Sequence, residues 1–208
     1  QSRMAIKQMS AKDRLAIFLY PPNLIGYARV WTLIISLREE DPWSSMSMWA
    51  LMISLGLDYL DGPCARALNM CTQFGDLLDH YTDHITMFWL VYVTSNSTIN
   101  IAVSALHCVV ACVYMAVYGH YFKHSAGVNF VTQIVEENNY FNMPALLWNA
   151  NTCIIPLIKM SFALEWGVPK KASTSLVDFV DMLGLLVTLA YSIAVCLPST
   201  RDKATANE

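Results

Sequence analysis

The sequence DYLDGPCARALNMCTQFGDLLDHYTD, residues 58–83, is the segment around which the rest of the chain is expected to be organised. Its pattern reads Asp58-x2-Asp61-Gly62-x2-Ala65-Arg66-x8-Gly75-x3-Asp79-x3-Asp83. Side chains three or four residues apart lie on one face of a helix, so the first two aspartates form one pair and the last two another. Gly75 extends the second row and lets a ligand or a neighbouring helix come close. The stretch therefore predicts a box of carboxylates between two helices.

Such a box predicts a metal site. Burying an unpaired carboxylate is costly, and like charges repel each other. Mg²⁺ and Mn²⁺ prefer oxygen ligands and commonly join a few carboxylates to substrate phosphates. We therefore expect one or two divalent cations at the aspartates.

The composition of the rest of the chain is that of a membrane protein. Of 208 residues, 55% are hydrophobic and 14% are charged. This balance predicts an all-α, polytopic membrane protein with one membrane domain, residues 15–198. A basic segment, residues 1–14, is expected to form an amphipathic helix on the cytoplasmic face, and residues 199–208 a cytoplasmic tail. The net charge of -3 and the absence of a basic, aromatic patch argue against a nucleic-acid partner.

Apolar runs predict six transmembrane helices. Pro21-Pro22 can begin a helix, so the first span covers about residues 23–37. The second runs from 43 to about 68, and the third starts near 75. Residues 85–118 hold no Asp, Glu, Lys or Arg and are too long for one span, so we expect a break at 95–98. The last two spans are expected near residues 143–164 and 176–197.

The placement of lysine and arginine predicts the orientation. With a cytoplasmic N-terminus, most basic residues outside the spans fall on the cytoplasmic side, as the positive-inside rule requires. This orientation places the aspartates at the cytoplasmic ends of the second and third spans. Four intramembrane carboxylates with this pattern of glycine and arginine indicate a phosphate ligand.

The pattern from Asp58 to Asp83 matches every defined position of the signature of the CDP-alcohol phosphatidyltransferases, membrane enzymes with six helices that usually form homodimers. Residues 20–29, YPPNLIGYAR, and the run from Ala65 to Asn69 also resemble eukaryotic phosphatidylinositol synthases within this family. The resemblance covers roughly residues 15–95. It implies a multi-pass protein of the endoplasmic reticulum that transfers the phosphatidyl group of CDP-diacylglycerol to myo-inositol and releases CMP.

The resemblance also implies roles for single residues. Asp58, Asp61 and Asp79 would hold two divalent metal ions, and Asp83 would both approach the metal and act as the general base. Residues expected to contact CDP-diacylglycerol are Asn23, Arg29, Gly62, Ala65, Arg66 and Gly75, with the glycines and the alanine leaving room for the nucleotide. From its apolar setting, Arg29 needs an anionic partner, either a nucleotide phosphate or a structural carboxylate.

The acceptor pocket is the part that the pattern defines least. A polyol needs several hydrogen-bond partners, and the polar groups near or inside the later spans are Lys123, Asn149, Asn151 and Lys159. Each has another interpretation. Lys123 could be a charge that sets the membrane topology, Lys159 could extend its ammonium group to the membrane surface, and the asparagines could form hydrogen bonds between helices.

Other functions stay open at this point. The residues of the shared signature are expected to bind the nucleotide and not the acceptor. Glycerol 3-phosphate, serine, choline or ethanolamine are therefore possible acceptors as well. A catalytically inactive membrane scaffold of the same fold would have no need for all four aspartates. A divalent-cation channel would not need the Gly62-x2-Ala65-Arg66 pattern.

Overall fold

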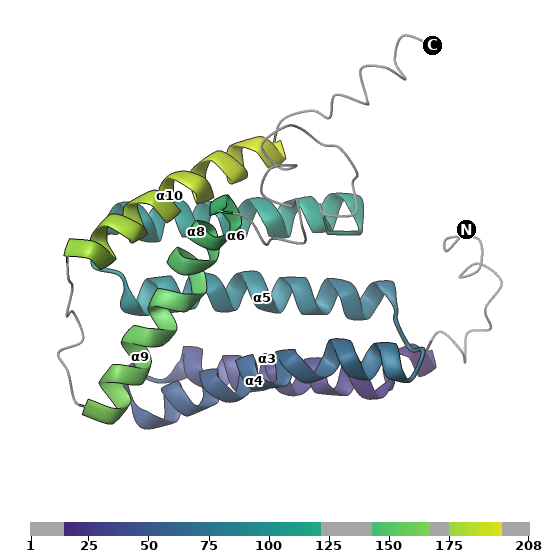
Figure 1. The fold of residues 1–208 in the computed structure, drawn as a ribbon. Coiled ribbons are helices and arrows are strands. Elements are labelled where there is room, and N and C mark those ends of the chain that lie inside the picture. The colour runs from purple at the N-terminus through teal and green to yellow at the C-terminus, as the bar shows by residue number, and fades with distance from the viewer. Residues whose placement is uncertain (1–14, 122–142, 167–174, 197–208) are drawn as a thin grey trace, which may run out of the picture. The chain divides into compact units, whose positions relative to one another are not determined.

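The computed structural model describes residues 15–121, 143–166 and 175–196. The regular structure within these ranges is helical (Figure 1), which confirms the all-α part of the predicted fold class. The chain separates into two compact units, and the division falls inside one helix, between Thr82 and Asp83. The predicted N-terminal amphipathic helix, the predicted tail and Lys123 lie outside the described residues.

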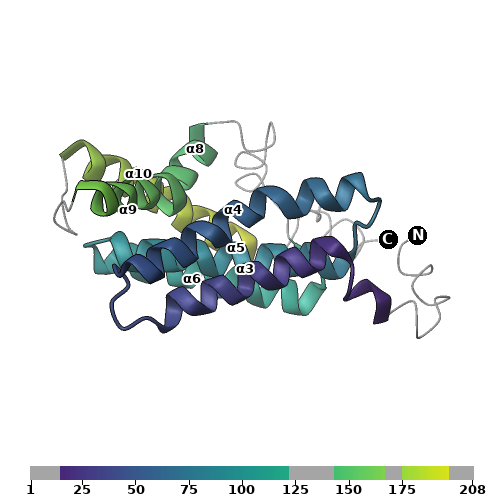
Figure 2. The ribbon, with the colours of Figure 1, turned by 90° about the horizontal axis from the view of Figure 1, so that it is seen from below.

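The first unit contains α3 (Pro21–Arg38), α4 (Ser45–Ala67) and the first part of α5 (Gln73–Thr94). Figures 1 and 2 show α3 and α4 running side by side. The proline pair begins α3 as predicted, because its missing N–H groups fall where a helix makes no internal bond. The hydroxyl of Ser44 begins α4 by accepting the N–H of Ser47 at 3.1 Å.

Small polar residues join α3 to α4. The hydroxyls of Ser36 and Ser47 lie 2.9 Å apart, and both residues are buried. The hydroxyl of Ser54 donates to the backbone carbonyl of Arg29 at 3.1 Å. Serine is small enough to let two helices approach closely while its hydroxyl still finds a partner. These bonds fix the turn of α3 that carries Arg29 against the part of α4 that leads to the aspartates.

A sharp turn separates α4 from α5. Asn69 has a φ of 54°, in the left-handed region that asparagine tolerates better than most residues. The N–H groups of Asn69 and Met70 donate to the carbonyls of Arg66 and Ala65 at 3.2 and 2.9 Å. These are the two hydrogen bonds of a Schellman motif. Thr72 then accepts the N–H of Gly75 at 3.0 Å and begins the next helix. The turn brings the two halves of the aspartate pattern back against each other.

The second unit contains the rest of α5, α6 (Thr98–Tyr118), α8 (Met143–Asn149), a π-helical segment (Ala150–Ile154), α9 (Ile155–Trp166) and α10 (Ser175–Cys196). The break that we predicted at residues 95–98 separates α5 from α6. Gly119, with a φ of 71°, ends α6. Tyr191 and Trp148 pack around His107, whose Nδ1 lies 2.9 Å from the hydroxyl of Ser192. This contact ties α6 to α10.

A π-helical segment interrupts the fifth predicted span. The predicted helix of residues 143–164 is observed as α8 and α9 with the segment Ala150–Ile154 between them. A Cβ atom on Gly184 of α10 would lie 2.5 Å from the carbonyl oxygen of Leu147 and closer still to Cβ of Asn151. Glycine is therefore required here for α10 to pack against this irregular turn.

Within the described ranges, α6 is the one helix whose length and apolar composition suffice to cross a membrane. The apolar part of α10, Met182–Ala194, is shorter. The helices of the first unit carry charged residues in their sequences, which lowers their hydropathy. In the part of the chain that the structure describes, each of the six predicted spans is helical, with α8, the π-helical segment and α9 together making the fifth. That all six cross a membrane stays a prediction.

Candidate metal and nucleotide site

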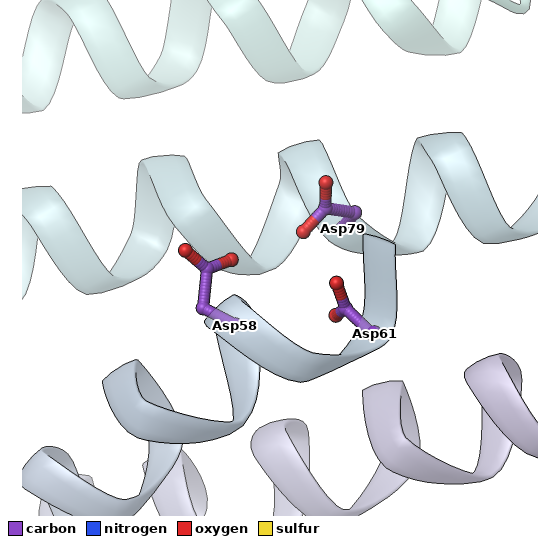
Figure 3. A group of neighbouring side chains, drawn as sticks. All are labelled: Asp58, Asp61 and Asp79. Atoms are coloured by element: carbon purple, nitrogen blue, oxygen red, sulfur yellow. The ribbon is translucent and has the colours of Figure 1, made fainter. Parts of the chain in front are cut away.

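Three of the four predicted aspartates come together. Asp58 and Asp61 lie one turn apart on α4, and Asp79 lies on α5; their ligand oxygens all fall within 4.8 Å of one another. In Figure 3, the three carboxylates face a common space between the two helices. Asp61 is buried, and the other two are half-buried. The predicted convergence of the two rows is confirmed for these three residues.

Asp83 is not a member of this group. It lies one turn beyond Asp79 on α5 and begins the second unit. Its predicted role as a fourth ligand and general base therefore stays a prediction.

Arg29 is the cation that holds the cluster together. Its guanidinium lies 2.7 Å from Asp58 and 2.6 Å from Asp61, and it also pairs with Asp79. The side chain of Arg29 is only 3% exposed. Of the two partners expected for this arginine, the structure shows the carboxylates. A planar guanidinium suits this position because it offers several donors in a fixed geometry.

The residues of the cluster fit a divalent cation. When all three carboxylates are ionised, one guanidinium against them leaves two net negative charges at a cluster whose carboxylate side chains are 12–37% exposed. Carboxylate oxygens are the ligands that Mg²⁺ and Mn²⁺ prefer. Both the charge and the donor atoms therefore favour a hard divalent ion.

A pocket of about 180 Å³ adjoins the cluster within the first unit. Asp61 and Asp79 form part of its wall. Five of the six residues predicted to contact the nucleotide also line it: Asn23, Gly62, Ala65, Arg66 and Gly75. The sixth, Arg29, lies among the aspartates instead. Two aspartates of the cluster and five of the predicted nucleotide-binding residues therefore line the same pocket, while their roles stay a prediction.

Two glycines of the pattern permit close approaches. A Cβ atom on Gly62 would lie 3.4 Å from the guanidinium of Arg66, which folds back over it. A Cβ atom on Gly75 would lie 2.7 Å from Oδ1 of Asn23. Asn23 is buried, and its amide donates to the carbonyl of Ile17 at 2.6 Å, which fixes its orientation. Gly75 therefore admits a neighbouring helix, as predicted.

Sequence reasoning missed part of the pocket wall. The missed residues are Pro22, Gly26, Met70, Cys71, Thr72, Asp76 and Leu78. Gly26 admits Leu78, whose side chain would lie 2.8 Å from an added Cβ atom. The turn residues Met70–Thr72 follow Asn69, and an asparagine after a helical run is a known signal for a helix end. That signal would have placed the turn, although not its contact with the pocket.

Of the predicted acceptor residues, the structure describes Asn149, Asn151 and Lys159, which belong to the second unit. Asn151 is buried, and its amide exchanges two hydrogen bonds with Asn100, at 2.9 and 3.1 Å. This is the bond between helices that the sequence left open as the other interpretation. Asn149 is half-buried at the end of α8, and Lys159 lines a different pocket in the second unit.

The chain belongs to the CDP-alcohol phosphatidyltransferase family, whose sequence model matches residues 19–190 of the 208. Among individual proteins, it is similar to the CDP-diacylglycerol–inositol 3-phosphatidyltransferases of Drosophila melanogaster, with 42% identity over 75 residues, and Homo sapiens, with 44% over 77 residues. A probable enzyme of the same name from Arabidopsis thaliana is 34% identical over 90 residues.

The similarity to these relatives is partial. The aligned region is 36% of this chain in the first two cases and 41% in the third. It spans 34%, 35% and 39% of the relatives' own lengths. The comparison with solved structures found no match.

Proposed function

We propose that this protein transfers the phosphatidyl group of CDP-diacylglycerol to myo-inositol, giving phosphatidylinositol and CMP. The observation that carries the proposal is the cluster of Asp58, Asp61 and Asp79 beside a pocket lined by the glycines and arginine of the family signature. The names of the similar proteins supply the donor and the acceptor.

The nucleotide of the donor would occupy the pocket of the first unit. The small side chain of Ala65 leaves room for the nucleotide, while Gly62 and Gly75 let the side chains of Arg66 and Asn23 take their places in the pocket wall. Arg66 is exposed at the rim, where its guanidinium can pair with a phosphate. Asn23 offers a fixed amide group inside the same pocket. Arg29 acts indirectly, since it orients the three carboxylates.

Two divalent cations, Mg²⁺ or Mn²⁺, would be held by Asp58, Asp61 and Asp79, with Asp83 as a further ligand. When bound, they would offset negative charge on the diphosphate and on the departing CMP. Asp83 takes the proton of the attacking hydroxyl of inositol. The hydroxyl oxygen then forms a bond to the lipid-side phosphorus, and the bond from this phosphorus to the oxygen of CMP breaks. CMP leaves with the electron pair.

The acceptor would be held by polar residues of the second unit. Our candidates are Lys123, Asn149, Asn151 and Lys159, because inositol needs several hydrogen-bond partners. The pairing of Asn151 with Asn100 uses one donor and one acceptor of its amide, so a further N–H and a lone pair remain for a ligand.

A membrane setting completes the proposal. We infer that the six helical segments cross the membrane of the endoplasmic reticulum, with residues 1–14 and the aspartates on the cytoplasmic side, and that the protein forms homodimers. The length and composition of α6 support the membrane placement. A lipid substrate also requires access from a bilayer.

The test is an acceptor assay with purified protein in vesicles. CDP-diacylglycerol and Mg²⁺ or Mn²⁺ are supplied with labelled inositol, glycerol 3-phosphate or serine in turn, and CMP release and labelled lipid are measured. We expect turnover with inositol only, and none after chelation of the metal. Turnover with another alcohol only would overturn the acceptor assignment, and no turnover with any acceptor would overturn the proposed activity.

A further inference from the structure

The guanidinium of Arg29 contacts all three aspartates that are proposed to hold metal ions. Its Nη1 atom lies 2.6 Å from Oδ2 of Asp61 and also contacts Oδ1 of Asp79, and its Nη2 atom lies 2.7 Å from Oδ1 of Asp58. Figure 3 shows these carboxylates facing one common space. One oxygen of each carboxylate is therefore paired with a positive charge that belongs to the chain itself.

Arg29 is fixed in this position. Its side chain is 3% exposed, and the hydroxyl of Ser54 on α4 donates to its backbone carbonyl at 3.1 Å. A guanidinium stays charged at any ordinary pH, and withdrawing it from its carboxylates would leave a buried charge unpaired. We therefore expect Arg29 to stay with the aspartates when a metal ion binds.

The charge of the cluster balances one divalent ion. Carboxylates ligate metals in their ionised form, so the three aspartates carry three negative charges, and the positive charge of Arg29 brings the sum to two. One Mg²⁺ or Mn²⁺ neutralises this sum. A second ion would leave two positive charges in excess at a partly buried site, where unbalanced charge is costly.

The proposed fourth ligand, Asp83, changes this balance only in part. With Asp83 the carboxylates would carry four negative charges against the one positive charge of Arg29, and two divalent ions would still exceed the remaining three by one. The missing negative charge must therefore come from a ligand. A diphosphate carries two negative charges and supplies the oxygen ligands that hard divalent ions prefer.

The pocket of the first unit can bring such a ligand to the cluster. Asp61 and Asp79, which both contact Nη1 of Arg29, line this pocket, and Arg66 lines it as well. A diphosphate bound by Arg66 would therefore lie beside two carboxylates of the cluster. It would add its charge from the pocket side, while Arg29 keeps its contacts with the aspartates.

We propose that Arg29 imposes an order on metal binding: the cluster binds one divalent ion on its own and a second ion only together with the diphosphate of the donor. Arg29 is thus a positioning residue, because its charge takes the place of the second ion's charge until the donor binds. By thermodynamic linkage, the donor and the second ion strengthen each other's binding by the same factor. The inference rests on the proposed donor and metal site, but not on the proposed acceptor.

Electron paramagnetic resonance with Mn²⁺ tests this order, because the signal of free Mn²⁺ reports how many ions are bound. The full chain in detergent, freed of metal, is titrated with Mn²⁺ alone, with CDP-diacylglycerol or with phosphatidylglycerol. No acceptor alcohol is added, so the donor is not consumed, and protein-free micelles of each composition are subtracted. We expect one bound ion per chain without lipid and with phosphatidylglycerol, which lacks a diphosphate, and two with CDP-diacylglycerol.

Matched variants test the role of the charge. Arg29→Gln should bind the first ion at least about tenfold more tightly, because a positive charge no longer repels it. With Asp83 as a ligand, this variant should also bind the second ion without the donor, since four carboxylates then balance two ions. Arg29→Lys keeps the charge, and Arg38→Gln removes a charge from an exposed position of the same helix, so both should bind one ion.

Three results would each overturn the inference: two ions on the wild type without the donor, no further ion with CDP-diacylglycerol, or an unchanged affinity for the first ion in Arg29→Gln. The two counts on the wild type need no variant, so they decide the outcome even if Arg29→Gln is too unstable to purify. A protein that shows both counts but no turnover in the acceptor assay would overturn the proposed activity and leave this order intact.

Discussion

The two units bury polar groups in different ways. In the first unit, a guanidinium that is 3% exposed binds three carboxylates. In the second unit, two buried polar contacts among the described residues are neutral: the amide pair of Asn100 and Asn151 and the contact of His107 with Ser192. The two partners of a neutral pair satisfy each other's hydrogen-bonding groups. A cluster with two net negative charges needs a further cation, because buried charge is costly unless it is balanced.

This difference indicates which buried contacts serve the proposed site and which serve stability. The first unit keeps an unbalanced charge, which suits a site whose remaining partners are a cation and a phosphate. The two neutral pairs of the second unit suit the packing of helices. Substitutions in the aspartate cluster should therefore alter activity most, whereas substitutions in these neutral pairs should alter chiefly the free energy of unfolding.

The largest effect should come from the aspartates. Asp79→Asn keeps the size of the side chain but removes one of the three charges, and it should lower CMP release by about 10³-fold, as expected for loss of one group that offsets transition-state charge. Asp41→Asn, in the exposed turn before α4, is the matched control and should keep its activity. The acceptor assay and a thermal unfolding curve check both variants. If Asp79→Asn kept more than a tenth of the activity, the cluster would not be the metal site.

The second largest effect should come from Arg29. Arg29→Gln leaves three carboxylates without their cation, which should cost about 3–5 kcal/mol of unfolding free energy in a metal-free buffer. Mn²⁺ should restore more stability to this variant than to the wild type, because it replaces the missing positive charge. Denaturant unfolding in EDTA and in Mn²⁺ measures both effects.

A double variant separates charge from packing. Arg29→Gln combined with Asp61→Asn should lose less than the sum of the single losses, because one repelling carboxylate is gone. Arg38→Gln, at an exposed position, should change stability by less than about 0.5 kcal/mol. Additive losses in the double variant would contradict the view that Arg29 stabilises the protein through these charges.

The first unit was the more predictable from sequence. Its aspartates stand out because charge is rare in apolar sequence, and the three- and four-residue spacings place them on helix faces. Helix positions also followed from local signals, such as Pro21–Pro22 at the start of α3. The partner of Arg29 did not follow, because a nucleotide phosphate and a carboxylate satisfy the same physical need.

The second unit was less predictable because its decisive contacts are not local. Asn100 and Asn151 are 51 residues apart, and the residues around each of them do not indicate that the two form a pair. The π-helical segment depends on Gly184 of α10, which admits the backbone at Leu147. A shift of helical hydrogen bonding that is stabilised by packing against another helix leaves no periodic signal in the segment itself. Its apolar residues therefore predicted only a continuous helix.

An effect of intermediate size should come from Gly75. An added Cβ atom would lie 2.7 Å from Oδ1 of Asn23 and 3.2 Å from the hydroxyl of Thr72, so Gly75→Ala should displace Asn23 from its place in the pocket. We expect a loss of about 1–3 kcal/mol in stability and a higher KM for CDP-diacylglycerol.

Gly56→Ala provides the matched control. It lies inside α4, and nothing is within 4 Å of an added Cβ atom. Alanine should therefore stabilise the helix there by about 0.5–1 kcal/mol and leave the KM unchanged. If the two alanine variants behaved alike, the close approach of Asn23 to Gly75 would have no role in the pocket.

The smallest expected effect on activity concerns the neutral pair of the second unit. Asn100→Leu and Asn151→Leu each leave one buried amide without its partner, at a cost of about 1–3 kcal/mol. The double variant removes both amides, so its loss should fall short of the sum by about 1 kcal/mol. A denaturant double-mutant cycle measures this coupling, and strict additivity would show that the pair does not stabilise the protein as a unit.

The kinetics of the same variants sharpen the comparison between the units. If Asn151 acts only through its pair with Asn100, either substitution disturbs the same contact, and we expect the KM for inositol to change alike in both variants. If the amide of Asn151 also contacted inositol, the two variants would differ in the KM for inositol, because only Asn151→Leu would remove that contact. A rise in KM confined to Asn151→Leu would therefore show that Asn151 contacts the acceptor, and the second unit would then contribute to the site as well as to stability.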